Sequence, residues 1–347
     1  MGKECQEAQE GSQQYLNGDD DVDICFISDD NFASKLGVCL MSLFDFNDGN
    51  KITIHLINSG ISEKNILLLK KLCQSAGSEL VIYNPTSIIQ KLKSLEFTAP
   101  VENNSIATLV RLFLPYIIPD SVHEIIYMDC DLLIRSDITS LYKAQFLEAA
   151  AGVIDANYDF YFKLRENYDY TRYINAGMLV INLPKYKERI RPDDVISILN
   201  THPYFADQDV INTLLKDDIT ILPPKYNATV KYRLADPKHL RNWVHWKKNV
   251  VYTNFELQEA HQTPSIIHFT ASLLGRPWEK SCIDPSTKLW RDYYDRSLWK
   301  DEPLQNKELS GSNRLGRLIY KKMPLSVYCS IDYNFAKRKF VKQMERK

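Results

Sequence analysis

Short apolar runs alternate with longer amphipathic stretches along the first half of the chain. Residues 22–27, 52–57 and 79–83 are rich in Val, Ile, Phe and Tyr and are bounded by polar residues, so they predict buried strands. The stretches that follow the first two, residues 32–44 and the segment from Ser62, predict helices. The second repeats its apolar residues at Ile66, Leu69 and Leu72. This alternation predicts an α/β fold with a mainly parallel sheet covered by helices on both faces.

Two later strands end on polar residues of unusual type. Residues 124–128 run directly into Asp129-Cys130-Asp131, and residues 265–267 end on His268. Ligands of parallel sheets bind beyond the carboxyl ends of the strands, so these residues are candidates for a site. Between them lie further strand-like and polar segments at residues 153–155, 173–182 and 207–212.

Asp129 and Asp131 carry the main chemical signal. Residues i and i+2 of an extended segment point the same way, so both carboxylates can face one cation. Mg²⁺ and Mn²⁺ prefer such oxygen ligands and keep open positions for substrate phosphates. The same pair could instead be a solvated end of a strand, and the D-x-D pattern alone does not decide between these interpretations.

Composition narrows the class of protein. In 347 residues, 44% are apolar and 25% charged, which is typical of a globular protein, and the net charge of -1 provides no basic field for nucleic acid. The seven cysteines are scattered without a C-x-x-C pair, against a disulfide framework or a structural zinc site and in favour of a reducing, cytoplasmic setting. We see no signal peptide and no apolar run of the ~20 residues that a membrane span needs.

The two ends of the chain differ from its middle. Residues 1–20 are polar and acidic and predict a disordered leader. Residues 314–347 hold ten Lys or Arg against two Asp or Glu, interleaved with apolar residues. This tail is typical of a basic amphipathic segment on an anionic membrane surface, at the inner face of the plasma membrane, although a solvated helical face would look the same. We therefore divide the chain into a leader (1–20), a catalytic domain (21–282) and a helical extension (283–347).

Seven motifs in order across residues 22–300 carry a resemblance to a family. The sequence resembles the retaining glycosyltransferases of family 8, which include bacterial lipopolysaccharide galactosyl- and glucosyltransferases and the glycogenins. The motifs are Phe26-Ile27-Ser28-Asp29-Asp30-Asn31-Phe32, Thr108-Leu109-Val110-Arg111-Leu112, Tyr127-Met128-Asp129-Cys130-Asp131, Ile174-Asn175-Ala176-Gly177-Met178, Asp207-Gln208-Asp209-Val210-Ile211-Asn212, Lys225-Tyr226-Asn227 and Ile267-His268-Phe269. The resemblance implies the nucleotide-binding, Rossmann-like GT-A fold.

The resemblance also implies roles for individual residues. Asp29, with Ser28 and Asn31 nearby, is expected to bind the uracil ring, although this run could equally cap a helix. Asp129, Asp131 and His268 are expected to hold Mn²⁺, with Mg²⁺ as the alternative, and Arg111 to pair with the carboxylates or the sugar. The expected hexose pocket contains Asp155, Asn175, Asp207 and Gln208. Cys130, Ala176, Gly177, Gly275 and Arg276 complete the set expected at the donor.

The implied reaction is transfer of glucose or galactose from a UDP-sugar to an acceptor glycan or glycolipid of the cell surface, with an α-linked product. Retention needs either a protein nucleophile or attack from the same face as the leaving group. Gln208 stands where the nucleophile is sought, and a neutral amide is a poor nucleophile. We therefore expect same-face attack, with Gln208 stabilising the cationic sugar and Asp207 positioning sugar or acceptor.

The loop after His268 departs from the family pattern His-x-x-Gly-x-x-Lys-Pro-Trp. Two residues are inserted, Ala271 stands at the usual glycine, and Arg276 replaces the lysine that meets the diphosphate. This departure leaves open a catalytically silent adaptor that binds sugar nucleotides. A metal-dependent nucleotidyltransferase is the other alternative, but the glycine-rich phosphate loop that it normally has is missing.

Overall fold

The computed structural model describes residues 22–94, 106–144, 146–163, 169–201, 206–247 and 251–344. The predicted leader, residues 1–20, lies outside the described residues. Within them, a seven-stranded sheet has the order β3-β2-β1-β4-β7-β6-β8. Its strands are β1 (Val22–Ser28), β2 (Ile52–Asn58), β3 (Glu79–Tyr83), β4 (Glu124–Met128), β6 (Ala150–Ile154), β7 (Ile174–Asn182) and β8 (Ile219–Ile221).

The sheet is mainly parallel, as predicted. β1 pairs in parallel with both β2 and β4, β2 with β3, and β6 with β8. The exception is β7, which runs antiparallel between β4 and β6. Central strands are buried on both faces, which explains why most of their residues are apolar.

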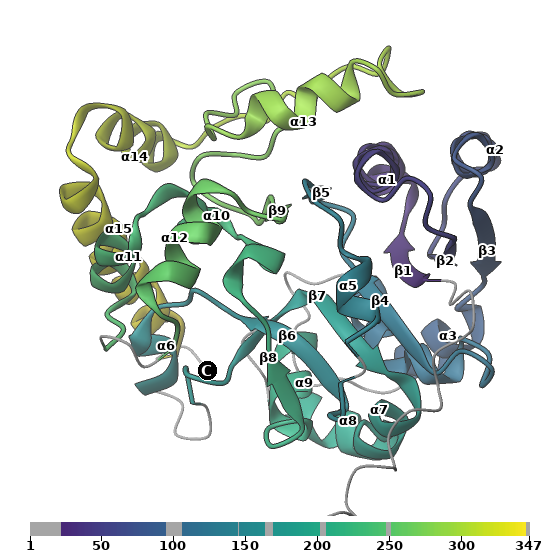
Figure 1. The fold of residues 1–347 in the computed structure, drawn as a ribbon. Helices are drawn as coiled ribbons and strands as arrows, with labels where there is room; N and C mark the ends of the chain where they lie inside the picture. Colours follow the sequence, from purple (N-terminus) through teal and green to yellow (C-terminus); the bar gives the residue numbers. More distant parts are fainter. Residues whose placement is uncertain are drawn as a thin grey trace, which may run out of the picture.

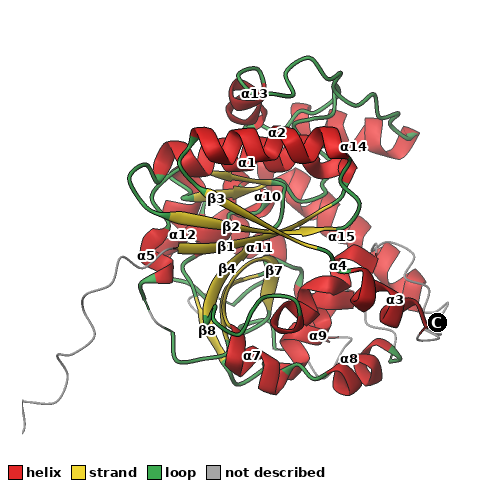
Figure 2. Ribbon diagram, turned by 90° about the vertical axis from the view of Figure 1, so that its right-hand side faces the viewer, coloured by secondary structure: helices red, strands yellow, loops and turns green. Residues whose placement is uncertain are grey.

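Helices lie against both faces of this sheet (Figures 1 and 2). Ser62 caps one of them, α2, by accepting a hydrogen bond from the Asn65 amide, as the sequence predicts. The helices are α1 (Ala33–Phe46), α2 (Glu63–Ser75), α3 (Thr86–Ser94), α4 (Ile106–Leu109), α5 (Thr139–Tyr142), α6 (Asp159–Lys163), α7 (Leu183–Arg189), α8 (Pro192–Leu199), α9 (Ala206–Leu214), α10 (Val230–Leu234), α11 (Pro237–Val244), α12 (Asn254–Gln262), α13 (Thr287–Tyr294), α14 (Gly311–Lys322) and α15 (Leu325–Met344), with 3-10 helices η1 (Asp30–Phe32), η2 (Val110–Tyr116) and η3 (Pro224–Asn227).

A second, two-stranded sheet joins distant parts of the chain. β5 (Leu132–Ile134) pairs antiparallel with β9 (Ile266–His268), and the register sets Leu132 opposite His268. The Phe269 amide donates to the Asp131 carbonyl at 3.0 Å. This pairing brings the candidate histidine beside the candidate carboxylates.

The C-terminal extension packs onto the rest of the molecule. Trp299, fully buried, lies against α1 at Gly37, and its indole Nε1 donates to Asn65 Oδ1 at 2.8 Å. Farther along, α15 buries Tyr328, Tyr333 and Phe340. No helix within the described residues is long and apolar enough to cross a bilayer.

Gly37 gives a test of this packing. A methyl group on Gly37 would lie 2.1 Å from the nearest ring atom of Trp299. We expect Gly37→Ala to lower the free energy of unfolding by about 1–3 kcal/mol, although alanine is the better helix former, because the tryptophan must move. Urea denaturation measures the effect. Gly311→Ala is the control because nothing lies within 4 Å of its added methyl; a Gly37→Ala protein as stable as the parent would refute the contact.

Candidate functional site

A cavity of about 370 Å³ opens at the carboxyl ends of β1 and β4. It has the position expected for a ligand site of an α/β sheet. Most of the residues that the sequence singled out line it, and they come from segments far apart along the chain. They are Ser28, Asp29, Arg111, Asp129, Cys130, Asp131, Asn175, Ala176, Gly177, Asp207, Gln208, His268 and Arg276.

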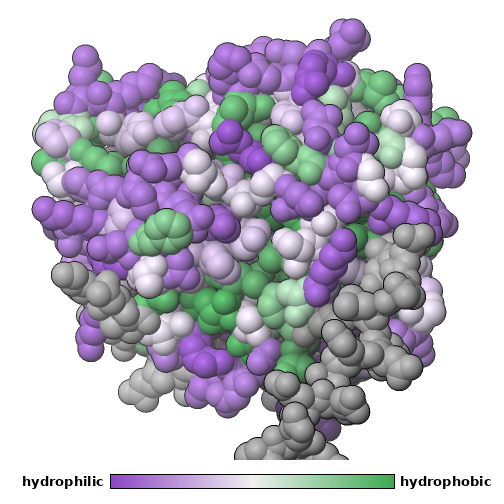
Figure 3. Space-filling view, viewed as in Figure 1, coloured by the Kyte–Doolittle hydropathy of each residue, from purple (hydrophilic) through white to green (hydrophobic). Residues whose placement is uncertain are grey.

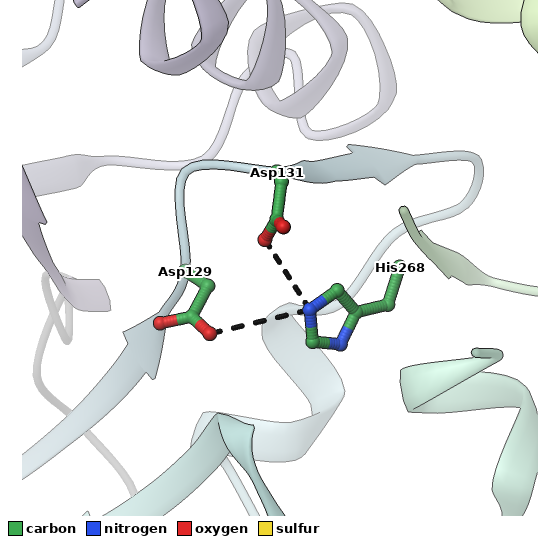
Figure 4. A group of neighbouring side chains, drawn as sticks. All are labelled: Asp129, Asp131 and His268. Carbon is green, nitrogen blue, oxygen red and sulfur yellow. Dashed lines mark ion pairs between the residues drawn. The ribbon is translucent and has the colours of Figure 1, made fainter. Parts of the chain in front are cut away.

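Asp129, Asp131 and His268 form a compact triad at this cavity (Figure 4). One potential ligand atom of each lies within 4.8 Å of those of the others. His268 Nε2 is 3.2 Å from Asp131 Oδ1 and 4.0 Å from Asp129 Oδ2. Two carboxylates and an imidazole that converge in this way are a suitable donor set for a divalent cation.

The environment of His268 fixes the orientation of its ring. Its Nδ1 lies 2.8 Å from Asn227 Oδ1, an amide oxygen that can only accept, so Nδ1 carries the hydrogen. Nε2 is then the nitrogen that faces the two carboxylates, where it can donate a hydrogen to Asp131 or, when deprotonated, offer its lone pair to a cation. Metal-binding histidines are typically oriented by such an outer hydrogen bond. Asn227 itself is fully buried and donates to Asn175 Oδ1 at 2.9 Å.

Gly177 leaves the space that the triad needs. A methyl group at this position would lie 2.3 Å from His268 Cε1 and 2.8 Å from Asp129 Oδ2. The Gly177 carbonyl also accepts from the Asp129 amide at 2.8 Å, which ties β7 to the start of the D-x-D segment. The requirement at Gly177 is therefore for the absence of a side chain.

Arg111 compensates the negative charge. Its side chain is buried, with Nη2 3.0 Å from Asp129 Oδ1 and Nε 3.0 Å from Asp207 Oδ2. Nη1 donates to the Ala176 carbonyl at 2.7 Å. Although burial opposes its charged form, Asp129, Tyr127 and Asp207 together raise the pKa of Arg111 above its usual value. Arg111 is thus a fixed cation that joins two carboxylates, not a surface arginine.

The acidic residues respond differently to this environment. Burial raises the pKa of Asp207 to about 6, with Arg111 acting in the opposite direction. Burial also disfavours ionised Asp131, but His268 and Arg276 outweigh it, so the pKa of Asp131 is lowered. Asp131 is therefore kept ionised beside the histidine.

A hydrogen-bond network extends from the triad to the other side of the cavity. Gln208 Nε2 donates to Asp155 Oδ2 at 2.8 Å, and Gln208 Oε1 accepts from the Ala176 amide at 3.1 Å and from Asn175 Nδ2 at 3.2 Å. Asn175 Oδ1 in turn accepts from Asn227, the partner of His268. The amide of Gln208 is thereby fixed in one orientation.

Comparison with known proteins identifies the family. The model of glycosyl transferase family 8 matches residues 23–282, about three quarters of the chain. The chain belongs to glycosyl transferase family 8. This assignment confirms the resemblance drawn from the seven motifs.

Relatives of this family 8 glycosyltransferase span most of its length. General stress protein A of Bacillus subtilis is 25% identical over 82% of this chain and 96% of its own length. A lipopolysaccharide 1,2-glucosyltransferase of Escherichia coli is also 25% identical, over 83% of this chain and 81% of its own. The solved structure of galactosyltransferase LgtC, in complex with donor and acceptor sugar analogs, superposes with a TM-score of 0.64 at 20% identity, over 84% of this chain and 99% of that one. The likeness to LgtC confirms the GT-A fold.

Three of the predicted residues lie beside the cavity instead of lining it. Asp155 acts through Gln208, and Asn31 Nδ2 is 3.5 Å from Asp29 Oδ2. Gly275 faces Arg317 and Glu279. Asp29 lines the cavity and also caps η1 by accepting from the Phe32 amide at 3.0 Å, so the two readings of this residue are compatible.

Two residues of the family 8 site have roles that sequence reasoning did not assign. The Tyr127 hydroxyl donates to Asp129 Oδ1 at 2.7 Å, and Asn227 orients His268. Tyr127 could have been found from its spacing, since residues i and i+2 of a strand share a face. Asn227 lay within a quoted motif, but its partner is set by tertiary packing.

Gly177 gives a direct test of the triad. We expect Gly177→Ala to weaken Mn²⁺ binding at least tenfold, because the methyl group would displace both His268 and Asp129. The electron paramagnetic resonance signal of free Mn²⁺ reports the affinity, and the thermal unfolding midpoint serves as a check on the fold. Parental Mn²⁺ affinity in a folded Gly177→Ala protein would count against this triad as the metal site.

Proposed function

We propose that this glycosyltransferase transfers glucose or galactose from a UDP-sugar to an acceptor glycan or glycolipid of the cell surface, with retention and an α-linked product. The observation that carries the proposal is that the Asp129–Asp131–His268 triad and Gln208 line one cavity, and that a continuous hydrogen-bond network joins His268 to Gln208 and Asp155. Relatives named as lipopolysaccharide 1,2-glucosyltransferase and 1,3-galactosyltransferase support a hexose donor and a surface glycan.

Asp129, Asp131 and His268 are the residues that would hold Mn²⁺, with Mg²⁺ as the alternative. The cation would act as a Lewis acid that neutralises the charge on the departing diphosphate. The nitrogen ligand favours Mn²⁺, because Mg²⁺ prefers an all-oxygen shell. Arg276, whose Nη2 is 3.8 Å from Asp131 Oδ2, would add a second positive charge for the phosphates.

The nucleotide would enter beside β1. Asp29, with Ser28 and Asn31 adjacent, supplies oxygen acceptors at the end of this strand for the uracil ring. Arg111 contributes differently. Because it already bonds to Asp129, Asp207 and the Ala176 carbonyl, we assign it to holding the carboxylates in place.

The surroundings of Gln208 favour same-face attack. Its oxygen accepts two hydrogen bonds, which withdraw electron density from an amide that is already a weak nucleophile. Asp207 is paired with Arg111 and is likewise a poor nucleophile. In the proposed step the bond from the anomeric carbon to the β-phosphate oxygen breaks. The acceptor hydroxyl bonds to that carbon from the same face, and its proton passes to the phosphate.

In this scheme Gln208 Oε1 stabilises the positive charge that develops on the sugar, and Asp155 and Asn175 hold the amide in place. Asp207 positions the sugar or the acceptor. The adaptor alternative rested on the altered loop after His268. In the structure that loop still sets Arg276 toward Asp131, and His268 is in the triad, which supports turnover.

Release of UDP tests the reaction. We expect free UDP from one hexose donor in a panel of UDP-sugars, dependent on Mn²⁺, abolished by EDTA, and reduced at least 100-fold in Asp131→Asn, because a ligand carboxylate is lost. A coupled UDP assay with and without glycan acceptors measures it. The Lys288→Gln protein, changed at an exposed helix, is the control. No release of UDP with any donor or acceptor would favour the catalytically silent adaptor. Pyrophosphate exchange would favour a nucleotidyltransferase.

We further propose that α14 and α15 attach the enzyme to an anionic membrane surface, at the inner face of the plasma membrane. Val327, Ile331 and Phe335 follow one another at i+4 spacing on α15, and the Phe335 side chain is 61% exposed. On α14, Leu315 and Leu318 are more than half exposed. Over this edge of the molecule, at the upper left of Figure 3, apolar and hydrophilic side chains intermingle.

The basic residues of these helices complement the exposed apolar ones. Lys321 and Lys322 end α14, and Lys337, Arg338 and Lys339 follow the apolar stripe of α15. Apolar side chains that enter the interface and lysines that meet anionic headgroups together make a peripheral anchor. Residues 345–347 of the predicted tail lie outside the described residues.

Vesicle binding tests the anchor. Deleting the tail would uncover buried Tyr333 and Phe340, so point changes are preferable. We expect Ile331→Ser with Phe335→Ser to reduce binding to vesicles containing anionic phosphatidylglycerol at least tenfold, as two inserted side chains are lost. Vesicle co-sedimentation measures it. Leu67→Ser, at an exposed leucine of α2, should bind normally. Equal binding by the double variant and its parent would remove this face from the proposal.

A further inference from the structure

The loop that carries Arg276 is held from behind by one arginine of α14. Arg317 is buried, and its Nε donates to the Leu273 carbonyl at 2.7 Å. Its Nη1 donates to the Ser281 carbonyl. These two carbonyls stand on either side of Arg276 in the sequence, so a single guanidinium spans the base of the loop.

The backbone of the loop is shaped around this guanidinium. Gly275 has a φ of +88°, and a methyl group there would lie 2.9 Å from Arg317 Nη2 and 2.7 Å from Glu279 Oε2. On the helix side, a methyl on Gly316 would lie 2.8 Å from the Leu273 side chain. Glycine at both positions allows α14 and the loop to approach closely. This contact explains why Gly275 faces away from the cavity.

The other end of the loop is fixed by α13. Arg291 donates from Nε to the Pro277 carbonyl at 3.1 Å and from Nη2 to the Glu279 carbonyl at 2.9 Å. Glu279 is itself buried and accepts from Lys307 at 3.0 Å. Backbone carbonyls on both sides of Arg276 are thus bound by arginines of the C-terminal extension.

Arg276 has few contacts of its own that could fix it. Its ion pair with Asp131 is long, at 3.8 Å, and its guanidinium carbon is 5.4 Å from the centre of the Trp278 ring. Among the described residues, its buried Nε has no hydrogen-bond partner. The direction of the Arg276 side chain therefore depends on the backbone that carries it.

We propose that Arg317 is a positioning residue for the donor diphosphate. By holding the Leu273 and Ser281 carbonyls it sets the loop in which Arg276 faces Asp131. The inference rests on the proposed function, in which Arg276 meets the phosphates of the UDP-sugar. Arg317 itself lies outside the lining of the cavity, so it would act through Arg276.

The test compares binding of UDP with binding of uridine, which lacks the phosphates, by titration calorimetry in Mn²⁺. We expect Arg317→Met to weaken UDP binding about tenfold and to leave uridine affinity unchanged, because the phosphate clamp alone is disturbed. Arg317→Lys keeps the positive charge but loses the planar guanidinium that donates to two carbonyls at once. We expect this variant to bind UDP about threefold more weakly. If the Arg317→Met protein does not fold, the comparison of UDP with uridine is made on Arg317→Lys alone. Arg314→Met, at an exposed arginine of α14, is the matched control.

A double variant separates positioning from simple anchoring of α14. If Arg317 acts through Arg276, adding Arg317→Met to Arg276→Met causes no further loss of UDP affinity. Additive losses, or an equal fall in uridine affinity, would overturn the inference. Loss of UDP affinity in Arg276→Met but not in either Arg317 variant would overturn it while sparing the proposed function. Unchanged UDP affinity in Arg276→Met would refute the phosphate role of Arg276 and the inference with it.

Discussion

The pairing of β5 with β9 is the constraint on which the site depends. Its register sets Leu132 opposite His268, and the Phe269 amide binds the Asp131 carbonyl at 3.0 Å. A residue of η3 is also needed, because Asn227 accepts the hydrogen bond from His268 Nδ1 that orients the ring. Because the β5–β9 pair lies outside the main sheet, this short ladder is what joins the D-x-D segment to the last third of the catalytic domain. A change of register by one residue would turn the imidazole to the opposite face and leave two carboxylates without it.

Electrostatic balance is the second requirement, and it follows from the first. Once Asp129, Asp131 and Asp207 are gathered in one partly buried cavity, their ionised forms need compensation. Arg111 provides a fixed cation for two of them, and His268 and Arg276 act on the third. Burial still raises the pKa of Asp207 to about 6, so the balance is incomplete on that side of the cavity. A divalent cation held by Asp129, Asp131 and His268 would add positive charge to this acidic cavity.

The site could be predicted where it depended on local pattern, and not where it depended on packing. Strand ends were readable from apolar runs, so Asp129, Asp131 and His268 were recognised as candidates, whereas Asp29 came from the family resemblance. The pairings between distant segments carry no such periodic signal: the antiparallel insertion of β7, the β5–β9 ladder and the contact of Asn227 with His268 all arise from tertiary structure. Gly275 shows the limit best. The family resemblance placed it at the donor, but only the position of Arg317 explains why it faces away from the cavity.

The C-terminal extension contacts two segments that carry site residues, the loop of Arg276 and the segment after Asp155. While α14 holds the loop of Arg276, α15 binds the segment that follows Asp155: Tyr333 donates to Asp159 at 2.8 Å, and the Tyr158 hydroxyl is bonded to Asp332. Asp155 in turn holds Gln208. The regions on the two sides of the division drawn at residue 282 are therefore joined by hydrogen bonds next to the site. Since the proposed membrane-facing residues lie on these same two helices, contact with a lipid surface would bear directly on the elements that flank the donor phosphates and the sugar. An enzyme that elongates a membrane-attached acceptor would then have its anchor and its active-site loops joined through one pair of helices.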